Sequence, residues 1–225
     1  MSIYGCFAQF YFYTSSGSIE CLILTVMAVD RYLAICNPLR YSSVMDSRRC
    51  SQLVASAWLA GFLVMSVITV TTCNLQFCGS NIIDHLFCDL APMLQIASAD
   101  TLVIEMEAMV IAVGLSIFPF TLIIGSYVSI FCTILRIPSD TGRKKAFSTC
   151  SSHLASVCTY FGTLFIIYLA PPHGRSMKLN KILSLLYIVV TPLFNPIIYS
   201  LRNQEIKACI SSYIVFYKGE TSSDF

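Results

Sequence analysis

Five long apolar stretches alternate with short polar segments along the chain. They cover approximately residues 7–35, 53–71, 109–135, 146–170 and 182–201. A helix rises about 1.5 Å per residue, so each stretch is long enough to cross roughly 30 Å of hydrocarbon. The polar residues inside them are mainly Ser, Thr, Gly and Cys, whose side chains can satisfy one another between packed helices. The pattern therefore predicts an all-α, integral membrane helical bundle.

Charged residues are scarce for a chain of this size. Only 12% of the 225 residues are charged and 56% are hydrophobic, with a mean hydropathy of +0.73. A soluble domain carries roughly a quarter charged residues and under half apolar ones. So little charge could not coat a soluble globule, so most of the surface is expected to face lipid.

Basic residues are divided unequally between the two ends of the predicted spans. Of the 14 Lys and Arg residues, all but Arg175, Lys178 and Lys181 lie on the side that carries Asp30 and Arg31. The positive-inside rule makes that side cytoplasmic. The predicted transmembrane bundle covers residues 1–217. Because five is an odd number of spans, the N-terminus is expected outside and the C-terminus inside. A short amphipathic helix is expected at about 203–217 on the inner leaflet, followed by a cytoplasmic tail at 218–225.

The end of the first stretch carries an Asp-Arg-Tyr triplet within the string Met-Ala-Val-Asp-Arg-Tyr-Leu-Ala-Ile-Cys, at residues 27–36. Three further blocks follow in order: Ser-Tyr at 126–127, Lys-Lys-Ala-Phe-Ser-Thr-Cys-Ser-Ser-His-Leu at 144–154, and Pro-Leu-Phe-Asn-Pro-Ile-Ile-Tyr-Ser-Leu-Arg-Asn at 192–203. Together they resemble the olfactory receptors, which are rhodopsin-like G-protein-coupled receptors. The resemblance covers about residues 5–208 and aligns the five spans with helices three to seven of the family's seven. It therefore leads us to expect an N-terminally incomplete receptor.

The resemblance implies a switch at the inner ends of the spans. The residues concerned are Asp30, Arg31, Tyr32, Tyr127, Asn195, Pro196 and Tyr199. Asp30 would hold Arg31 in the resting state, and activation would free Arg31 to face a heterotrimeric stimulatory G protein. On the residues alone, Asp30 and Arg31 could instead be an ordinary anchor whose charged groups reach the lipid headgroups.

A ligand site is expected between the outer halves of the spans. Helical spacing from the family motif makes the following residues face inward: Tyr13, Gly17, Ser18, Cys21, Ile111, Leu115, Phe161, Leu164, Phe165 and Tyr168. These side chains are mostly apolar with few hydroxyl groups, which suits a small hydrophobic odorant held by burial and one or two hydrogen bonds. Ordinary packing between helices would explain the same positions.

Four of the 11 cysteines, at positions 6, 73, 78 and 88, are expected at the outer face, where they can oxidise. The resemblance implies a disulfide between Cys6 and Cys88. Cys78 is left to pair with Cys73 or to remain free. The three histidines are far apart in the sequence, so no metal site is expected, and no cofactor is expected either.

These observations predict an odorant-binding receptor of the plasma membrane whose partners are a small hydrophobic odorant, a stimulatory G protein and the lipid bilayer, with no nucleic acid. No enzyme signature is present: there is no Gly-x-Ser-x-Gly elbow, phosphate-binding glycine loop or His-Glu-x-x-His helix. One alternative is a non-signalling, truncated product retained in the endoplasmic reticulum. Another is a transporter segment, which would favour a charged path or internal repeats, and neither is visible in the sequence.

Overall fold

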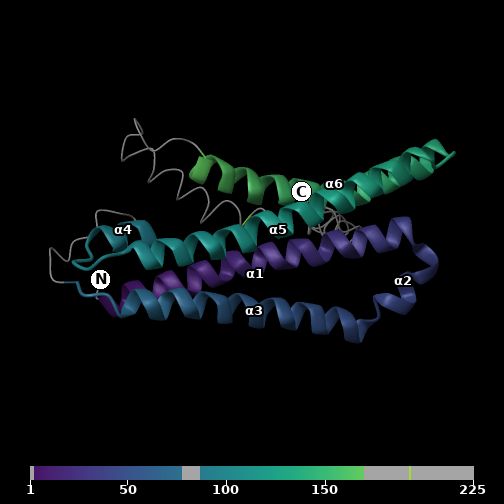
Figure 1. Ribbon diagram of the computed structural model, residues 1–225. Coiled ribbons are helices and arrows are strands. Elements are labelled where there is room, and N and C mark those ends of the chain that lie inside the picture. The colour runs from purple at the N-terminus through teal and green to yellow at the C-terminus, as the bar shows by residue number, and fades with distance from the viewer. Residues whose placement is uncertain (1–2, 78–86, 170–192, 194–225) are drawn as a thin grey trace, which may run out of the picture. The chain divides into compact units, whose positions relative to one another are not determined.

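Helices account for all the regular structure in the part of the chain that the computed structural model describes, which is residues 3–77, 87–169 and 193 (Figure 1). The helices are α1 (Ile3–Cys36), α2 (Pro38–Val44), α3 (Ser47–Cys73), α4 (Leu90–Gln95), α5 (Leu102–Leu135) and α6 (Asp140–Leu169). The chain divides into two units, residues 1–146 and 147–225, which we describe separately. The first four apolar stretches are thus helical, as predicted. The fifth stretch, the amphipathic helix at 203–217 and the tail lie outside the described residues.

The long helices begin before their apolar stretches, and at α3 a polar residue caps the first turn. Asp46 precedes α3, and its carboxylate accepts a hydrogen bond of 2.7 Å from the backbone N–H of Arg49. This bond satisfies one of the amides that a helix start leaves without a partner. The α5 helix begins at Leu102, several residues before the predicted boundary at 109, because Glu105 and Glu107 interrupt the apolar run without ending the helix. Hydropathy therefore marked the apolar part of each helix and not its full length.

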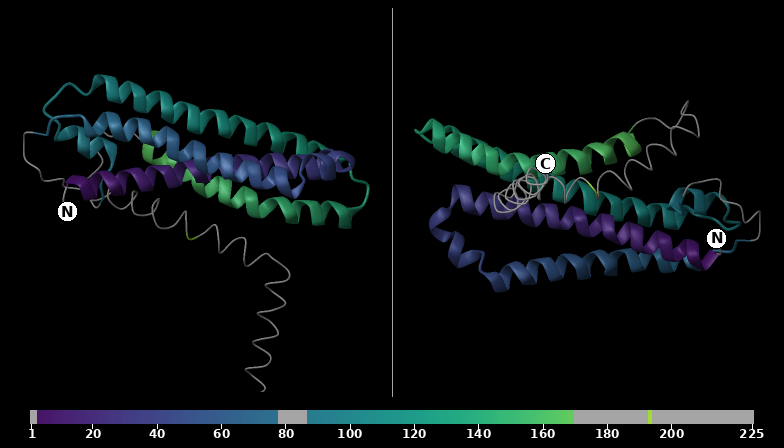
Figure 2. Two further views of the ribbon diagram at one scale, coloured as in Figure 1. Left: turned by 90° about the horizontal axis from the view of Figure 1, so that it is seen from below. Right: turned by 180° about the vertical axis from the view of Figure 1, so that it is seen from behind.

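In the first unit, α1 lies between α3 and α5 and packs against both of them (Figures 1 and 2). The α1 and α5 helices run in the same direction, since Cys21 and Cys36 of α1 contact Leu115 and Thr133 of α5, respectively. The α3 helix runs the opposite way. Ser66 lies near the C-terminal end of α3, and its hydroxyl group is 3.3 Å from the hydroxyl group of Tyr11, near the N-terminal end of α1.

The closest approach of α1 and α3 occurs at Gly61. A Cβ atom at this position would lie 2.5 Å from Cγ1 and 3.3 Å from the backbone nitrogen of Ile19. Ile19 is only 5% exposed, so its side chain has little room to move away. The absence of a side chain at Gly61 therefore sets the distance between the two helices.

One hydrophobic cluster holds together the end of this unit at which α1 begins. We call this end the outer end and the opposite one the inner end, after the predicted orientation. It contains Cys6, Phe10, Met65, Ile68, Cys88, Met93 and Ile104, which come from α1, α3, α4, α5 and the segment just before α4. The disulfide between Cys6 and Cys88 joins two members of the cluster whose Cα atoms are 5.3 Å apart. The predicted disulfide is thus confirmed. It fastens the segment at 87–89 to the start of α1.

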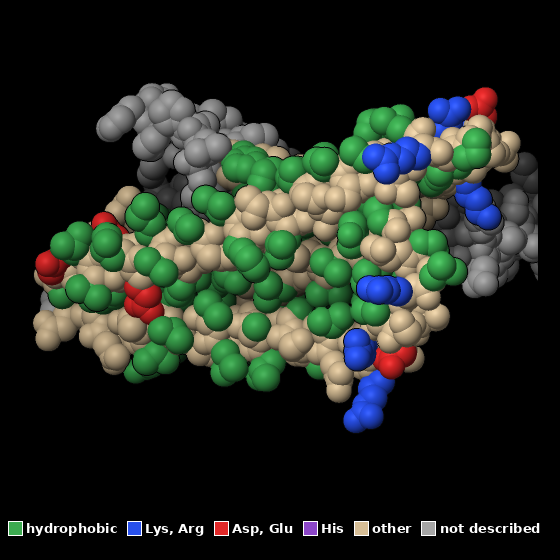
Figure 3. Space-filling model, turned by 45° about the vertical axis from the view of Figure 1, so that its right-hand side comes forward, with side chains coloured by type: hydrophobic (Ala, Val, Ile, Leu, Met, Phe, Trp, Pro, Cys, Tyr) green, Lys and Arg blue, Asp and Glu red, His purple; other side chains and the backbone are tan. Residues whose placement is uncertain are grey.

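Large apolar side chains cover the outside of α3 and α5. Leu59, Leu63, Val67, Val103 and Val110 are all exposed. Figure 3 shows hydrophobic side chains across the middle of one face, with Lys and Arg side chains gathered towards one end. Among the described helices, α3 and α5 are long and apolar enough to cross a membrane. A surface of this kind suits contact with lipid.

Candidate functional site

Asp30, near the inner end of α1, forms a hydrogen bond with Tyr41 of α2. The Tyr41 hydroxyl donates to Oδ1 of Asp30 at 2.9 Å. Pro38 favours the start of α2 because its fixed φ suits a first helical turn. The bond and the negative charge of Asp30 raise the pKa of Tyr41, since both disfavour the phenolate.

The structure therefore pairs Asp30 with Tyr41, whereas the resemblance implied a contact between Asp30 and Arg31. No ion pair joins Asp30 to Arg31 in the described part of the chain, whereas Asp140 and Arg143 do form one. Consecutive residues of a helix point in different directions, so their side chains do not face each other. The Nε atom of Arg31 is buried and has no hydrogen-bond partner among the described residues.

The other predicted switch residues lie in different parts of the chain. Tyr32 is half-buried on α1, and Tyr127 is half-buried on α5. Cys36 and Thr133 connect the inner ends of these same two helices, with 3.2 Å between Sγ and Oγ1. Asn195, Pro196 and Tyr199 lie outside the described residues.

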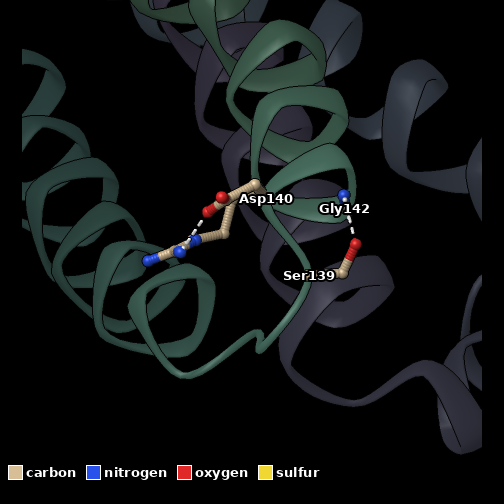
Figure 4. Close-up of polar contacts among 4 residues, drawn as sticks. Ser139, Asp140 and Gly142 are labelled. Carbon is tan, nitrogen blue, oxygen red and sulfur yellow. Dashed lines mark hydrogen bonds and ion pairs between the residues drawn. The ribbon is translucent and has the colours of Figure 1, made fainter.

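The start of α6 places further basic residues beside the end of α5. Ser139 precedes the helix, and its hydroxyl accepts a hydrogen bond of 3.3 Å from the backbone N–H of Gly142 (Figure 4). Asp140 in the first turn pairs with Arg143, also drawn in Figure 4. This cap begins the helix just before Lys144 and Lys145, both of which are exposed.

Six of the predicted ligand residues lie on α1 and α5, and the structure brings two of them into direct contact. The thiol of Cys21, which is 1% exposed, donates a hydrogen bond of 3.0 Å to the backbone carbonyl oxygen of Leu115. Ile111 and Leu115 pack against the outer hydrophobic cluster. The hydroxyl of Ser18 is buried and donates to the carbonyl of Thr14 at 2.8 Å, so its proton is used within α1. Tyr13 and Gly17 are half-buried.

Pro119 explains why the carbonyl of Leu115 needs a donor from another helix. In a regular helix, the carbonyl at position 115 would accept from the amide of residue 119. Pro119 has no amide hydrogen and lies inside α5. The thiol of Cys21 supplies the missing donor. The four-residue interval between Leu115 and Pro119 was visible in the sequence, but the partner on α1 was not.

The remaining predicted ligand residues lie on α6 in the second unit. Phe161 is 3% exposed, Leu164 is half-buried and Phe165 is 44% exposed. The rings of Tyr160 and Phe161 meet edge to face, with their centres 5.1 Å apart. The side chain of Tyr168 lies outside the described part of the structure.

Two contacts at the outer end involve residues that the sequence did not single out. The rings of Phe87 and Tyr13 meet edge to face with 5.3 Å between their centres, so the segment before α4 contacts a predicted ligand residue. The side-chain oxygen of Gln9 accepts a hydrogen bond of 3.2 Å from the backbone N–H of Cys88. The position of Phe87 beside Cys88 was the signal that could have identified it, once the disulfide was expected.

A polar contact between α3 and α5 was also missed. The hydroxyl of Thr71 donates to Oε2 of Glu107 at 2.9 Å. No sequence spacing relates these two residues, so only the packing of α3 against α5 reveals the contact. Within the described ranges, no group of three or more His, Cys, Asp or Glu side chains is placed to hold a metal ion.

Comparison with known proteins identifies the family. The family model for olfactory receptors matches residues 1–216. Human olfactory receptor 11A1 is 44% identical over 221 residues, which are 98% of this chain and 70% of that protein. Human olfactory receptor 10A7 is 45% identical over 95% of this chain and 68% of its own length, and mouse olfactory receptor 5G9 is 47% identical over 93% and 67%. Olfactory receptors are membrane-spanning, G-protein-coupled receptors that act in odour sensing and are not enzymes. This chain, with its apolar helices and its Cys6–Cys88 disulfide, belongs to the olfactory receptor family.

Proposed function

We propose that this chain provides helices three to seven of an odorant receptor and couples a small, largely hydrophobic ligand to a stimulatory G protein. The observation that carries the proposal is the contact between Cys21 and Leu115. It joins α1 to α5 in the middle of the predicted ligand residues. A ligand that alters this contact acts on the two helices whose inner ends carry Arg31 and Tyr127.

The chemistry of the predicted ligand residues supports a hydrophobic odorant. In the first unit, Ile111 and Leu115 offer aliphatic surface, and Ser18 and Cys21 already donate hydrogen bonds within the protein. Few hydrogen-bond donors therefore remain for a ligand, and burial of apolar surface would supply most of the affinity for an odorant. In the second unit, Phe161, Leu164, Phe165 and Tyr168 of α6 remain proposed ligand residues.

The inner end offers two features suited to a protein partner. Leu39 on α2 is 96% exposed and stands next to Arg40 in the sequence, so its apolar side chain is accessible to another protein. Arg31 has a buried Nε atom without a partner, so a change that brings an acceptor to Arg31 would be favourable. In the proposed active state, Arg31 and Tyr127 line an opened inner cavity. Asn195, Pro196 and Tyr199, which lie outside the described residues, remain proposed switch residues, with Asn195 and Pro196 as the hinge.

The proposed topology has five spans, with the N-terminus outside and the C-terminus in the cytoplasm. Support comes from the position of the described basic residues, all of which lie near the C-terminal ends of α1 and α5, in α2, or near the starts of α3 and α6. The amphipathic helix at 203–217 would lie on the inner leaflet, and residues 218–225 would form the tail.

A cyclic-AMP assay tests this proposal. Cells would express the full chain with an N-terminal epitope tag, and surface staining without permeabilisation would report the orientation. We expect hydrophobic odorants to raise cyclic AMP in these cells, and Arg31→Ala to remove the response without reducing surface staining. Retention inside the cell together with no response would instead support the non-signalling alternative.

A further inference from the structure

Glu107 differs from the other described acids at the outer end of the first unit. Asp89, Asp100 and Glu105 each accept a hydrogen bond from a donor no more than four residues away. These bonds lie at helix starts, where a carboxylate also interacts favourably with the helix dipole. Glu107 lies beyond the first turn of α5, and its hydrogen-bond partner, Thr71, belongs to α3. Local helix capping therefore explains the other three acids and leaves Glu107 unexplained.

Glu107 lies in line with two of the proposed ligand residues. It precedes Ile111 by four residues and Leu115 by eight, so the three share one side of α5. The α1 and α5 helices run in parallel, and Cys21 is level with Leu115. Tyr13 precedes Cys21 by the same eight residues, which places Glu107 at about the level of Tyr13. Glu107 thus lies on the same side of α5 as Ile111 and Leu115, nearer the outer end of the helix, with its carboxylate bonded to Thr71 of α3.

Within the described part of the chain, the charge of Glu107 has little compensation. The side chain is half-buried, and the hydroxyl of Thr71 is a neutral donor. Every Lys and Arg of the described ranges lies towards the inner end, where Figure 3 shows the basic side chains gathered, while Arg175, Lys178 and Lys181 fall outside those ranges. A partly desolvated carboxylate is stabilised most by a charged donor, because charge-assisted hydrogen bonds are the strongest.

We infer that Glu107 makes this receptor selective for odorants that carry a basic amine on an apolar body. The inference rests on the proposed function. The ammonium group would donate to the carboxylate of Glu107, and the apolar body would lie along Ile111 and Leu115. Simple alkylamines are protonated at neutral pH, as lysine side chains are. The acids at the outer end also attract cations from solution.

Matched ligands separate this inference from a purely structural role of Glu107. The probes are pairs of primary amines and primary alcohols on the same straight-chain, cyclic and benzylic carbon skeletons. We expect the amine of each active pair to activate the full chain at a concentration at least about tenfold below that of the alcohol. Glu107→Gln keeps an oxygen that can accept from Thr71 but removes the charge, and should reduce this ratio to near one.

The control is Thr71→Val, which removes the bond between α3 and α5 but leaves the charge of Glu107. It should preserve the preference for amines. Equal potency of amines and alcohols on the unmodified chain, or a preference that survives Glu107→Gln, would overturn the inference while leaving the proposed function standing. No response to any probe, from protein that reaches the cell surface, would instead count against the proposed function and the inference that rests on it.

Discussion

The thiol of Cys21 on α1 donates to the one α5 carbonyl that Pro119 deprives of its amide partner, that of Leu115. A proline inside a helix normally leaves this acceptor to water or to a neighbouring helix, and water is scarce in a membrane interior. Here the donor comes from the neighbouring helix α1. The bond therefore links a break in the hydrogen bonding of α5 to the helix that carries Asp30 and Arg31.

Removing this donor should destabilise the protein. Cys21→Ala should lower the free energy of unfolding by about 1–3 kcal/mol, because a buried carbonyl loses its partner and a small cavity forms. Cys21→Ser keeps a donor and should cost less. The measurement is thermal unfolding of the detergent-solubilised protein.

Repeating the Cys21→Ala substitution in a protein that also carries Pro119→Ala tests whether Pro119 is the reason for the bond. Pro119→Ala supplies an amide to the carbonyl of Leu115, so Cys21→Ala should cost less in that background than in the unmodified chain. An equal cost in both backgrounds would show that Cys21 acts by packing alone.

Gly61 should not tolerate a side chain. Gly61→Ala places a Cβ atom 2.5 Å from Cγ1 of the buried Ile19, and overpacking of this kind typically costs about 1–3 kcal/mol. Gly114→Ala is the matched control, because a Cβ atom there meets nothing within 4 Å. Thermal unfolding should show a clear loss for the first variant and none for the second. Similar effects of the two substitutions would mean that α1 and α3 can separate without cost.

Tyr41 should stabilise the inner end of α1 over a defined pH range. Its pKa is raised by the hydrogen bond to Asp30 and by the charge of Asp30, so the protonated phenol is favoured in the folded state. The contribution is complete below the ordinary tyrosine pKa of about 10 and is lost as the pH rises through the higher folded value. The difference in melting temperature between the unmodified chain and Tyr41→Phe should therefore be constant near neutral pH and shrink in strong alkali. A melting-temperature difference that grows as the pH rises would mean that the pKa of Tyr41 is lowered and not raised in the folded protein.

Leu39 should contribute to coupling and not to folding. A side chain that is 96% exposed can be shortened at little cost, so Leu39→Ala should change stability by less than about 0.5 kcal/mol. It should nevertheless reduce the maximum cyclic-AMP response. Leu63→Ala, an exposed apolar position on α3, is the control and should leave the response intact. Equal responses from Leu39→Ala and the unmodified chain would remove Leu39 from the proposed coupling surface.

Hydropathy and motifs predicted those features of the fold that depend on sequence neighbours. The apolar stretches gave the positions of α1, α3, α5 and α6, and the resemblance gave the Cys6–Cys88 disulfide. The helices start earlier than the apolar stretches, and at α3 the start depends on a single capping side chain, that of Asp46, and not on hydropathy.

The contacts between helices could not be read from the sequence. The bond between Asp30 and Tyr41 depends on how α2 folds back towards α1, and the bond between Thr71 and Glu107 depends on the packing of α3 against α5. Both are set by tertiary packing, which fixes which side chains meet only after the helices have formed. For the ligand residues, the sequence predicted a set of positions, and the structure adds a direct contact between two of them, Cys21 and Leu115.

Nucleotide exchange on a purified stimulatory G protein tests the central claim most directly. The full chain would be reconstituted in lipid vesicles, and uptake of a non-hydrolysable GTP analogue by the heterotrimer would be followed with and without an activating odorant. The proposed function predicts that the odorant speeds this uptake and that Arg31→Ala abolishes the effect. An uptake rate that stays at the level of empty vesicles, with folded chain and odorant present, would contradict it.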